Sequence, residues 1–507
     1  MIWHIFKKDA RLLWPFAALA ALVHGLNAVA AAFSTGIDKL FFASIPLALV
    51  SLLSLVVLVV SVAQQDLVPG ERQDWLIRPI NRLHLVAAKL LFVVLLGLAP
   101  MCIADVALGL ARELPLGDVL AASVRRSAAL LCYICVPTLI FAAMTRTLTE
   151  FVVTVAVAAV ALIGLFSITP VVGLVDTLSA SGIAWITTCF WGILSVLAAL
   201  TILPQQYLHR RTLRTRWLSG GALVCALLAS MLPWRAGFAI QEHFAPQPRA
   251  GAAVALEYDP TAPVRLVHQG RQTGEDGALI LFTLRATNLP GNTQLRPDHY
   301  TVRMLDGDGK TLYQGESKLR MSIYPQPGAP LRQEDAASAP VVAQQAVEIT
   351  SPMPLHKPGQ IVRVEIDYSL TLFRAVAQDR IADRGNDQLL AGFARCTTRP
   401  GNGGDPVNMV CLSTHPWSAC LTGYRVEKLT GKKTWHFTSC DTVDYAPFAG
   451  AIWRDAYFRL GWFGTGQSFP KAADKPDNPG VGPTVIETLL PQDHFTRRVV
   501  IPQLQLP

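Results

Sequence analysis

The chain has little charge for its length, and no apolar run long enough to cross a bilayer is clear after about residue 235. Lys, Arg, Asp and Glu make up only 16% of its 507 residues, whereas hydrophobic residues make up 51%. This balance is unusual for a soluble protein of this size. The net charge of +8 does not indicate nucleic-acid binding, because the basic residues gather at the ends of apolar segments. The composition therefore predicts a membrane protein.

Apolar segments crowd the first half of the chain. Seven of them approach the length of about 20 residues that a transmembrane helix requires. They lie near 13–34, 42–63, 84–106, 122–144, 150–172, 183–203 and 217–234, and the last is short. We predict a polytopic α-helical membrane bundle of about seven spans over residues 13–234. Residues 28–30 resemble a signal-peptide cleavage site, but the apolar run is long and further spans follow, so we expect no cleavage.

The basic residues predict the orientation of the bundle. With the N-terminus in the cytoplasm, eleven basic residues fall inside and four outside, as the positive-inside rule favours. The inner ones are Lys7, Lys8, Arg11, Arg72, Arg78, Arg82, Arg146, Arg210, Arg211, Arg214 and Arg216, and the outer ones are Lys39, Arg112, Arg125 and Arg126. We expect a multi-pass protein of the inner or plasma membrane with an extracytoplasmic C-terminal module. Loss of the short seventh crossing would reverse that placement.

The second half of the chain changes to a period of two. Polar residues alternate with the apolar residues Val362, Val364, Ile366, Tyr368, Leu370 and Leu372, which is typical of a strand with one buried face. We predict a β-sandwich-like domain over 245–375 and a Cys-containing, β-rich lobe over 376–507. Residues 305–310 look like the start of a calcium loop but lack its later ligands, so we expect a hairpin turn.

Four cysteines cluster in the C-terminal lobe. Their even number in an exported domain predicts two disulfides among Cys396, Cys411, Cys420 and Cys440. Three pairings are possible, and we favour 396–411 with 420–440 because the Gly-rich turn at 401–404 could fold the first pair into a hairpin. The alternative treats Cys411, His415 and Cys420 as metal ligands, but their spacing fits no standard zinc pattern.

Residues 1–12 form an amphipathic segment. Trp3 and Phe6 fall on one helical face, and Lys7, Lys8 and Arg11 fall on the other. This pattern predicts an interfacial helix whose cations face anionic lipid. Pro15 would then bend the chain into the first span. The alternative is a charged flank of an ordinary membrane helix.

The segment 66–82, between the second and third predicted spans, carries a short semi-amphipathic element. Trp75, Leu76 and Ile80 can form an apolar face while the neighbouring arginines stay in water. Pro79 breaks the helix, and Arg82 can begin a new one near the membrane surface. A short, rigid element of this kind is what a bundle needs to receive force from a cytoplasmic partner.

With Arg78, Pro79, Arg82, Ala88 and Lys89 in this order, and with 5–9 at the entry helix, residues 1–205 resemble the type-2 ABC exporter permeases. The resemblance implies that segment 66–82 is a coupling helix. Its ATPase-docking residues would be Trp75, Arg78, Pro79, Arg82 and Lys89. It also implies a separate ABC ATPase subunit and a homodimer or heterodimer of permease units in the lipid bilayer. The seventh span and the large outer module are additions to the family pattern.

Signatures of catalysis are lacking. Residues 430–434 are without the first glycine of a phosphate-binding loop, and neither GxSxG nor HExxH occurs. We therefore expect no enzymatic activity, cofactor or metal in this chain, and ATP hydrolysis would belong to the partner. His24 and Asn27, about one turn apart in the first span, are candidates for an intramembrane functional site. A helix–helix hydrogen bond is the simpler interpretation of this pair.

Together, these patterns predict the membrane permease subunit of an ABC-type exporter whose outer domain handles or gates substrate. The alternative is a membrane-anchored extracytoplasmic binding or assembly protein without transport activity. A membrane enzyme of unrecognised chemistry is a third, weaker interpretation.

Overall fold

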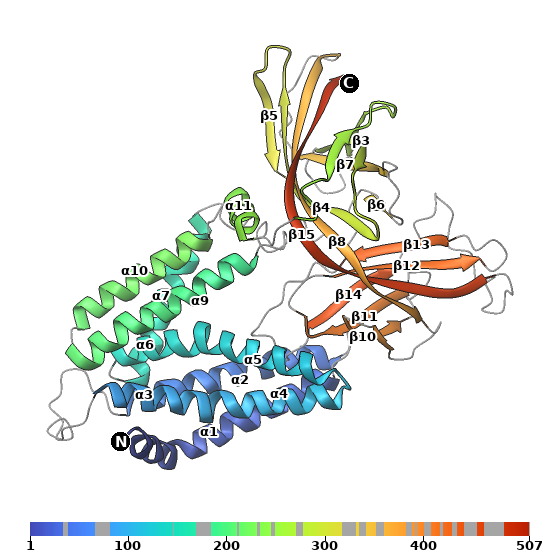
Figure 1. Cartoon of the computed structure of the whole chain (residues 1–507). Helices are drawn as coiled ribbons and strands as arrows, with labels where there is room; N and C mark the ends of the chain where they lie inside the picture. Colours follow the sequence, from blue (N-terminus) through green and yellow to red (C-terminus); the bar gives the residue numbers. More distant parts are fainter. Residues whose placement is uncertain are drawn as a thin grey trace.

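The computed structural model shows a helical N-terminal half and a strand-rich C-terminal half (Figure 1). It describes residues 1–505 except 34–38, 66–81, 146, 169–183, 210–211, 231–233, 245–248, 270–276, 317–330, 334–340, 351–358, 382–387, 391–392, 400–406, 416–418, 428–432, 441–453 and 461–480. The predicted division into a helical membrane region and a β-rich region is confirmed.

The helical half contains α1 (Ile2–Phe33), α2 (Lys39–Gln64), α3 (Arg82–Phe92), η2 (Val93–Leu98), α4 (Ala99–Ala111), α5 (Leu116–Leu130), η3 (Leu131–Cys135), α6 (Val136–Met144), α7 (Leu148–Ile168), α9 (Ala184–Pro204), η4 (Gln205–His209), α10 (Thr212–Ser230) and α11 (Trp234–Phe244). The run α3–η2–α4 is continuous, as is α5–η3–α6, and each contains a π-helical segment. Pro100 and Pro137 lie in the first turns of α4 and α6, directly after these segments. A proline lacks the N–H for the i−4 hydrogen bond, and the wider π turn accommodates that defect.

Among the described residues, five helical segments are long and apolar enough to cross a membrane. They are Ile2–Ala30, Pro46–Gln64, Leu83–Ala111, Leu116–Met144 and Thr188–Tyr207. They correspond to the first four predicted spans and the sixth. The fifth and seventh predictions fall on α7, of which Leu148–Val157 counts as a shorter apolar helix, and on α10, which begins with charged residues. The total of seven spans therefore stays a prediction.

Large apolar side chains cover the outward faces of these helices. Leu19, Leu53, Ile103, Val153 and Leu197 are each more than half exposed. Water would penalise so large an apolar surface, whereas lipid tails accept it. The inward faces pack into a core that includes Leu55, Phe92 and Leu139.

Helix α1 continues through Pro15 to Phe33 as a single helix. The bend predicted at Pro15 therefore does not interrupt the helix. Pro15 removes only one backbone hydrogen bond, while Leu13 and Ala17 on either side of it are buried in the bundle core. Whether the first turns of α1 lie in the headgroup layer stays a prediction.

The C-terminal half contains β1 (Ala255–Tyr258), β2 (Arg265–Gln269), β3 (Gly277–Thr287), β4 (Thr293–Leu305), β5 (Thr311–Glu316), β6 (Leu331–Gln333), β7 (Val341–Thr350), β8 (Ile361–Ile381), β9 (Gln388–Leu390), β10 (Ala394–Arg399), β11 (Val407–Ser413), β12 (Cys420–Glu427), β13 (Lys433–Cys440), β14 (Arg454–Leu460) and β15 (Val481–Gln505). Within the described residues they form sheets in the orders β1-β3-β2 with β7 on β3, β14-β11-β10-β9, and β13-β12-β15-β8-β4-β5 with β6 on β4. The alternating apolar residues of β8 all face the core, as the period of two predicted.

Strands β8 and β15 pair antiparallel along most of their length and run through both lobes (Figure 1). The predicted lobe boundary at 375/376 lies inside β8, so one seven-stranded sheet is shared by both lobes. The register of β15 shifts beside Leu489 and at Pro491. Proline cannot donate to the ladder, and such irregularities bend a strand, which lets the sheet turn from one core to the next.

Two disulfides are present, in the pairing that we favoured. Cys396–Cys411 joins β10 to β11, and Cys420–Cys440 joins β12 to β13. In both cases the cysteines are direct cross-strand partners. The metal-ligand alternative is wrong, because Cys411 and Cys420 are disulfide-bonded and have no thiolate to offer. Stable disulfides fit an oxidising, extracytoplasmic compartment.

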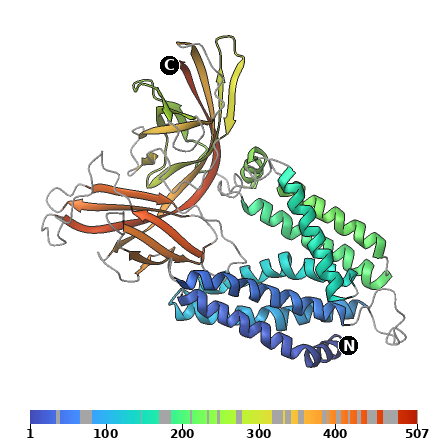
Figure 2. The ribbon, with the colours of Figure 1, turned by 180° about the vertical axis from the view of Figure 1, so that it is seen from behind.

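The strand-rich half packs against one end of the helical bundle, and the N-terminus lies at the other end in both views (Figures 1 and 2). Strands β10 and β11 lie near the turn that joins α4 to α5. Helix α11 leads from α10 toward β15. We call residues 249–505 the outer module.

Candidate functional site

A cluster of polar side chains lies inside the bundle, where four helices meet. The guanidinium of Arg126 on α5 donates from Nη1 to both carboxylate oxygens of Asp105 on α4, at 2.8 and 2.9 Å. His24 on α1 places Nε2 3.4 Å from Asp105 Oδ1 and Nδ1 3.1 Å from the hydroxyl of Ser51 on α2. All four side chains are buried. We call these residues the intramembrane cluster.

The intramembrane cluster contains one negative and one positive side chain in direct contact. The charges of Asp105 and Arg126 cancel, which reduces the large cost of a lone charge among apolar helices. With its proton on Nε2, His24 satisfies both of its contacts, because Nε2–H donates to Asp105 and Nδ1 accepts from the Ser51 hydroxyl. The cluster therefore joins α1, α2, α4 and α5 by polar contacts.

A second buried ion pair lies toward the opposite end of the bundle. Lys89 on α3 donates from Nζ to Asp9 Oδ2 on α1 at 2.9 Å, and both side chains are 0% exposed. Next to this pair, the Phe6 ring lies 6.4 Å from the ring of Phe92, which is also on α3. The first turns of α1 are therefore fastened to α3 by one charged and one aromatic contact.

These contacts change the interpretation of several predicted residues. Lys89 is fully buried, so its ammonium does not lie on a surface that an ATPase could contact. Phe6 is only 6% exposed and packs in the bundle core rather than facing headgroups. Trp3, at 53% exposed, keeps the outward position that an interfacial helix requires, and Lys7 lies 5.7 Å from its ring. Lys8 and Arg11 are also exposed.

The other predicted docking residues are Trp75, Arg78, Pro79 and Arg82. Trp75, Arg78 and Pro79 lie outside the described residues. Arg82 is the first residue of α3, so the predicted start of a helix at this position is observed. The role of segment 66–82 in docking stays a prediction.

His24 and Asn27 are both buried in the first span, as predicted, and His24 contacts two other helices. The sequence-based prediction of this site does not include the charged neighbours of His24. It does not name Asp105, and it places Arg126 among the basic residues of the outer turns, whereas the structure buries Arg126 against Asp105. The sequence does contain a signal for this contact: an acid and a base lie in consecutive apolar segments. Charged residues within a membrane are expected to pair with each other.

The outer module contacts the bundle at the turn between α4 and α5. Arg395 on β10 donates from Nη1 to Glu113 Oε2 at 2.6 Å and to the carbonyl of Arg112 at 3.2 Å. Arg125 on α5 donates from Nη2 to the carbonyl of Thr414 at 3.2 Å. Leu412 on β11 packs with Leu114, Val119 and Ala122 at the start of α5. Residues far apart in the chain therefore meet at this end of the bundle.

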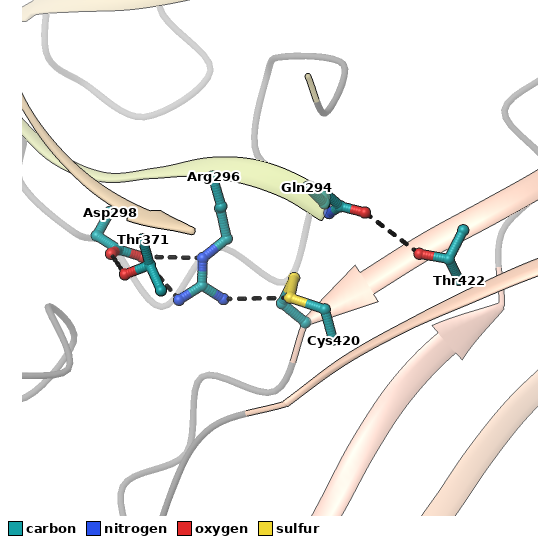
Figure 3. The surroundings of a disulfide bond; sticks show 7 residues. Gln294, Arg296, Asp298, Thr371, Cys420 and Thr422 are labelled. Atoms are coloured by element: carbon teal, nitrogen blue, oxygen red, sulfur yellow. Dashed lines mark hydrogen bonds and ion pairs between the residues drawn. A yellow bond between two sulfur atoms is a disulfide. The ribbon is translucent and has the colours of Figure 1, made fainter. Parts of the chain in front are cut away.

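A polar network lies beside the second disulfide (Figure 3). The Arg296 guanidinium donates from Nε to Asp298 at 2.8 Å, and Nη1 lies 3.9 Å from Cys420 Sγ. Thr371 bridges Asp298 to the Nδ1 of His494. Burial lowers the pKa of His494, so this imidazole is neutral and buried. The hydroxyl stands between the acid and the imidazole, which is the wrong order for a nucleophile activated by a base. We interpret this network as structural.

Within the described residues, no group of three or more His, Cys, Asp or Glu side chains could hold a metal ion. No known protein-family model matches the chain, and no curated protein matches its sequence. The function must therefore be argued from the residues and their geometry.

Proposed function

We propose that this chain is the membrane subunit of an ABC-type exporter, driven by a separate cytoplasmic ATPase that docks on segment 66–82. The observation that supports this proposal best is the buried Asp9–Lys89 pair. Lys89 lies in the helix that directly follows the proposed docking segment, and Asp9 lies in the first turns of α1. A displacement of the docking segment would therefore move α3 and α1 together.

The path from the docking segment into the membrane continues along the same helices. The run α3–η2–α4 carries the Lys89 contact near its start and Asp105 near its end. It contains a π-helical segment at Val93–Leu98, and such segments often occur at functional sites. A movement of α3 would thus reach the intramembrane cluster, which ties α4 to α1, α2 and α5.

The proposed orientation has a cytoplasmic N-terminus and an extracytoplasmic outer module. The outer module contacts the turn at 112–115, which the basic-residue bias places outside. Helix α10 is 19 residues long, and its apolar stretch follows Arg214 and Arg216, which the positive-inside rule places on the cytoplasmic side. A crossing by α10 would return the chain to that same side.

The decisive experiment is co-purification of the full-length chain, expressed in its own host, with any ABC ATPase subunit that the host membranes contain. We expect Arg78→Glu with Arg82→Glu to abolish co-purification, because the docking surface would change sign. The matched control is Arg214→Glu with Arg216→Glu, which reverses two exposed charges at the start of α10. Arg216 lies 4.0 Å from Glu150 in an exposed pair, so the control should cost little stability.

Three results are distinguishable. Loss of the complex in the docking variant alone supports the proposal. Equal retention in both variants contradicts the docking assignment, and equal loss shows a general charge effect that also contradicts it.

The alternative is a membrane-anchored extracytoplasmic binding or assembly protein. The fact that favours it is that Asp105 and Arg126 pair with each other inside the bundle, as they would in a static scaffold. An intact outer module that binds a ligand, in a chain that never associates with an ATPase, would support this alternative.

A further inference from the structure

We propose that the outer module acts as a clasp on the membrane bundle. The hairpin β10–β11 restrains α5, and α5 in turn keeps Arg126 paired with Asp105 in the intramembrane cluster. Two adjacent residues of α5 contact different parts of the protein. Arg125 donates to the carbonyl of Thr414 in the outer module, and Arg126 donates to Asp105 in the cluster. Successive residues of a helix point about 100° apart, so one turn of α5 contacts both the outer module and the bundle interior.

The α5 side of the clasp is a short, tightly turned segment. Glu113 adopts a left-handed conformation with φ of 55°, and the N–H of Leu114 donates to the carbonyl of Gly109 at 3.1 Å. The turn therefore reverses the chain within a few residues and leaves Glu113 in reach of Arg395. Because the turn is short, a pull on Glu113 moves the end of α4 and the start of α5 together.

The outer-module side of the clasp is rigid. Arg395 and Leu412, which make the contacts, are cross-strand partners in β10 and β11. The next pair along the same ladder is Cys396–Cys411, which is a disulfide. A covalent link directly behind the contact residues keeps the two strands from parting when force is applied.

The outer module is also fastened to helix α11. Arg249 pairs with Glu242 on α11, lies 3.5 Å from Asp493 and donates to the carbonyl of His494 at 2.9 Å. Helix α11 follows α10 in the chain. The outer module therefore contacts both α11 and the α4–α5 turn, which are remote in sequence. Movement of α11 away from this turn together with the outer module requires the hairpin to release the turn.

The contact is small enough to open. Leu412 is the outer-module side chain in the apolar cluster, and the polar contacts involve exposed or half-exposed groups such as Glu113 and Arg395. Contacts of this size open locally without global unfolding. The inference does not depend on the transport proposal, because a clasp of this kind would operate in a transporter or in a scaffold.

The test is hydrogen–deuterium exchange of the full-length protein in lipid nanodiscs. Leu412→Ala removes the apolar contact. Because truncating a buried Leu destabilises the packing around it, we expect amide exchange at least about tenfold faster at 116–130 and also at 101–110. Arg395→Ala removes the ion pair, and we expect about threefold faster exchange in the same segments. The control is Arg498→Ala, which breaks an exposed pair with Asp367 elsewhere in the outer module and should leave both segments unchanged.

The reciprocal experiment starts from the cluster. Arg126→Lys keeps the charge but loses the paired hydrogen bonds to Asp105. Coupling free energies are reciprocal, so this variant should speed exchange in β10 and β11.

The outcomes separate cleanly. Faster exchange at both 101–110 and 116–130 supports the clasp. Faster exchange confined to the hairpin and the 112–115 turn overturns it, because the contact would then transmit nothing. If Leu412→Ala also loosens β12 and β15, the milder Arg395→Ala decides alone, and unchanged exchange at 101–110 in that variant overturns the proposal.

Discussion

The buried pair between Asp9 and Lys89 makes the sharpest prediction about this protein. The two charges lie 2.9 Å apart with no exposure to solvent. At an effective dielectric constant of about 20 their attraction is about 6 kcal/mol. Desolvation offsets much of that attraction, but removing one partner leaves the other charge buried and uncompensated, which costs about 3–5 kcal/mol.

We therefore expect Lys89→Met to lower the free energy of unfolding by about 4 kcal/mol. The double variant Asp9→Leu with Lys89→Met should recover most of that loss, because two apolar side chains replace two charges. The assay is an SDS titration in mixed micelles, followed by helical circular dichroism. The matched control is Lys8→Met, since Lys8 is 55% exposed and lies 3.5 Å from the same carboxylate, and it should cost less than about 1 kcal/mol.

Equally small effects of Lys89→Met and Lys8→Met would contradict a buried, solvent-free ion pair. Water would then reach Asp9 in the membrane-embedded protein, and the mechanical link between α1 and α3 would be lost with it. A double variant no more stable than Lys89→Met would show instead that the cost arises from lost packing rather than from charge.

Other predictions follow from the same structure. Arg126→Met should cost about 3 kcal/mol in the SDS titration, because Asp105 loses its charged partner inside the bundle. Adding Asp105→Asn should restore most of that stability, and no restoration would contradict the pairing. Replacing Cys396 and Cys411 by Ala should destabilise the outer module by about 3 kcal/mol, which is the loop-entropy value for a disulfide with a sequence separation of 15. Limited proteolysis of the outer module should then become faster, and an unchanged cleavage rate would contradict a stabilising role of this disulfide. Burial lowers the pKa of His299 from 6.5 to about 4, so the unfolded chain takes up the proton first as the pH falls. Outer-module stability should be complete above about pH 6.5 and fall by up to about 3 kcal/mol as the pH drops to about 4, a slope that His299→Gln should flatten if the assignment holds.

Periodicity predicted the parts of the fold that depend on local sequence. Apolar runs placed five of the membrane helices, because lipid demands about 20 apolar residues per crossing whatever the neighbours are. Alternation in residues 360–373 placed β8 and its buried face for a similar local reason. The favoured disulfide pairing also rested on spacing, and Cys396 and Cys411 do lie opposite each other in neighbouring strands.

The tertiary structure decided which polar residues meet. The position of Lys89 after the docking segment predicts a surface cation, yet the packing of α3 on α1 buries Lys89 against Asp9. The sequence places Arg126 in an outer turn, whereas the packing of α5 against α4 pairs it with Asp105. The clasp contact between Arg395 and Glu113 joins positions more than 280 residues apart. No local pattern encodes such pairs, because burial and partnership depend on how whole helices and sheets pack, whereas the formation of each helix or strand depends on its own side chains.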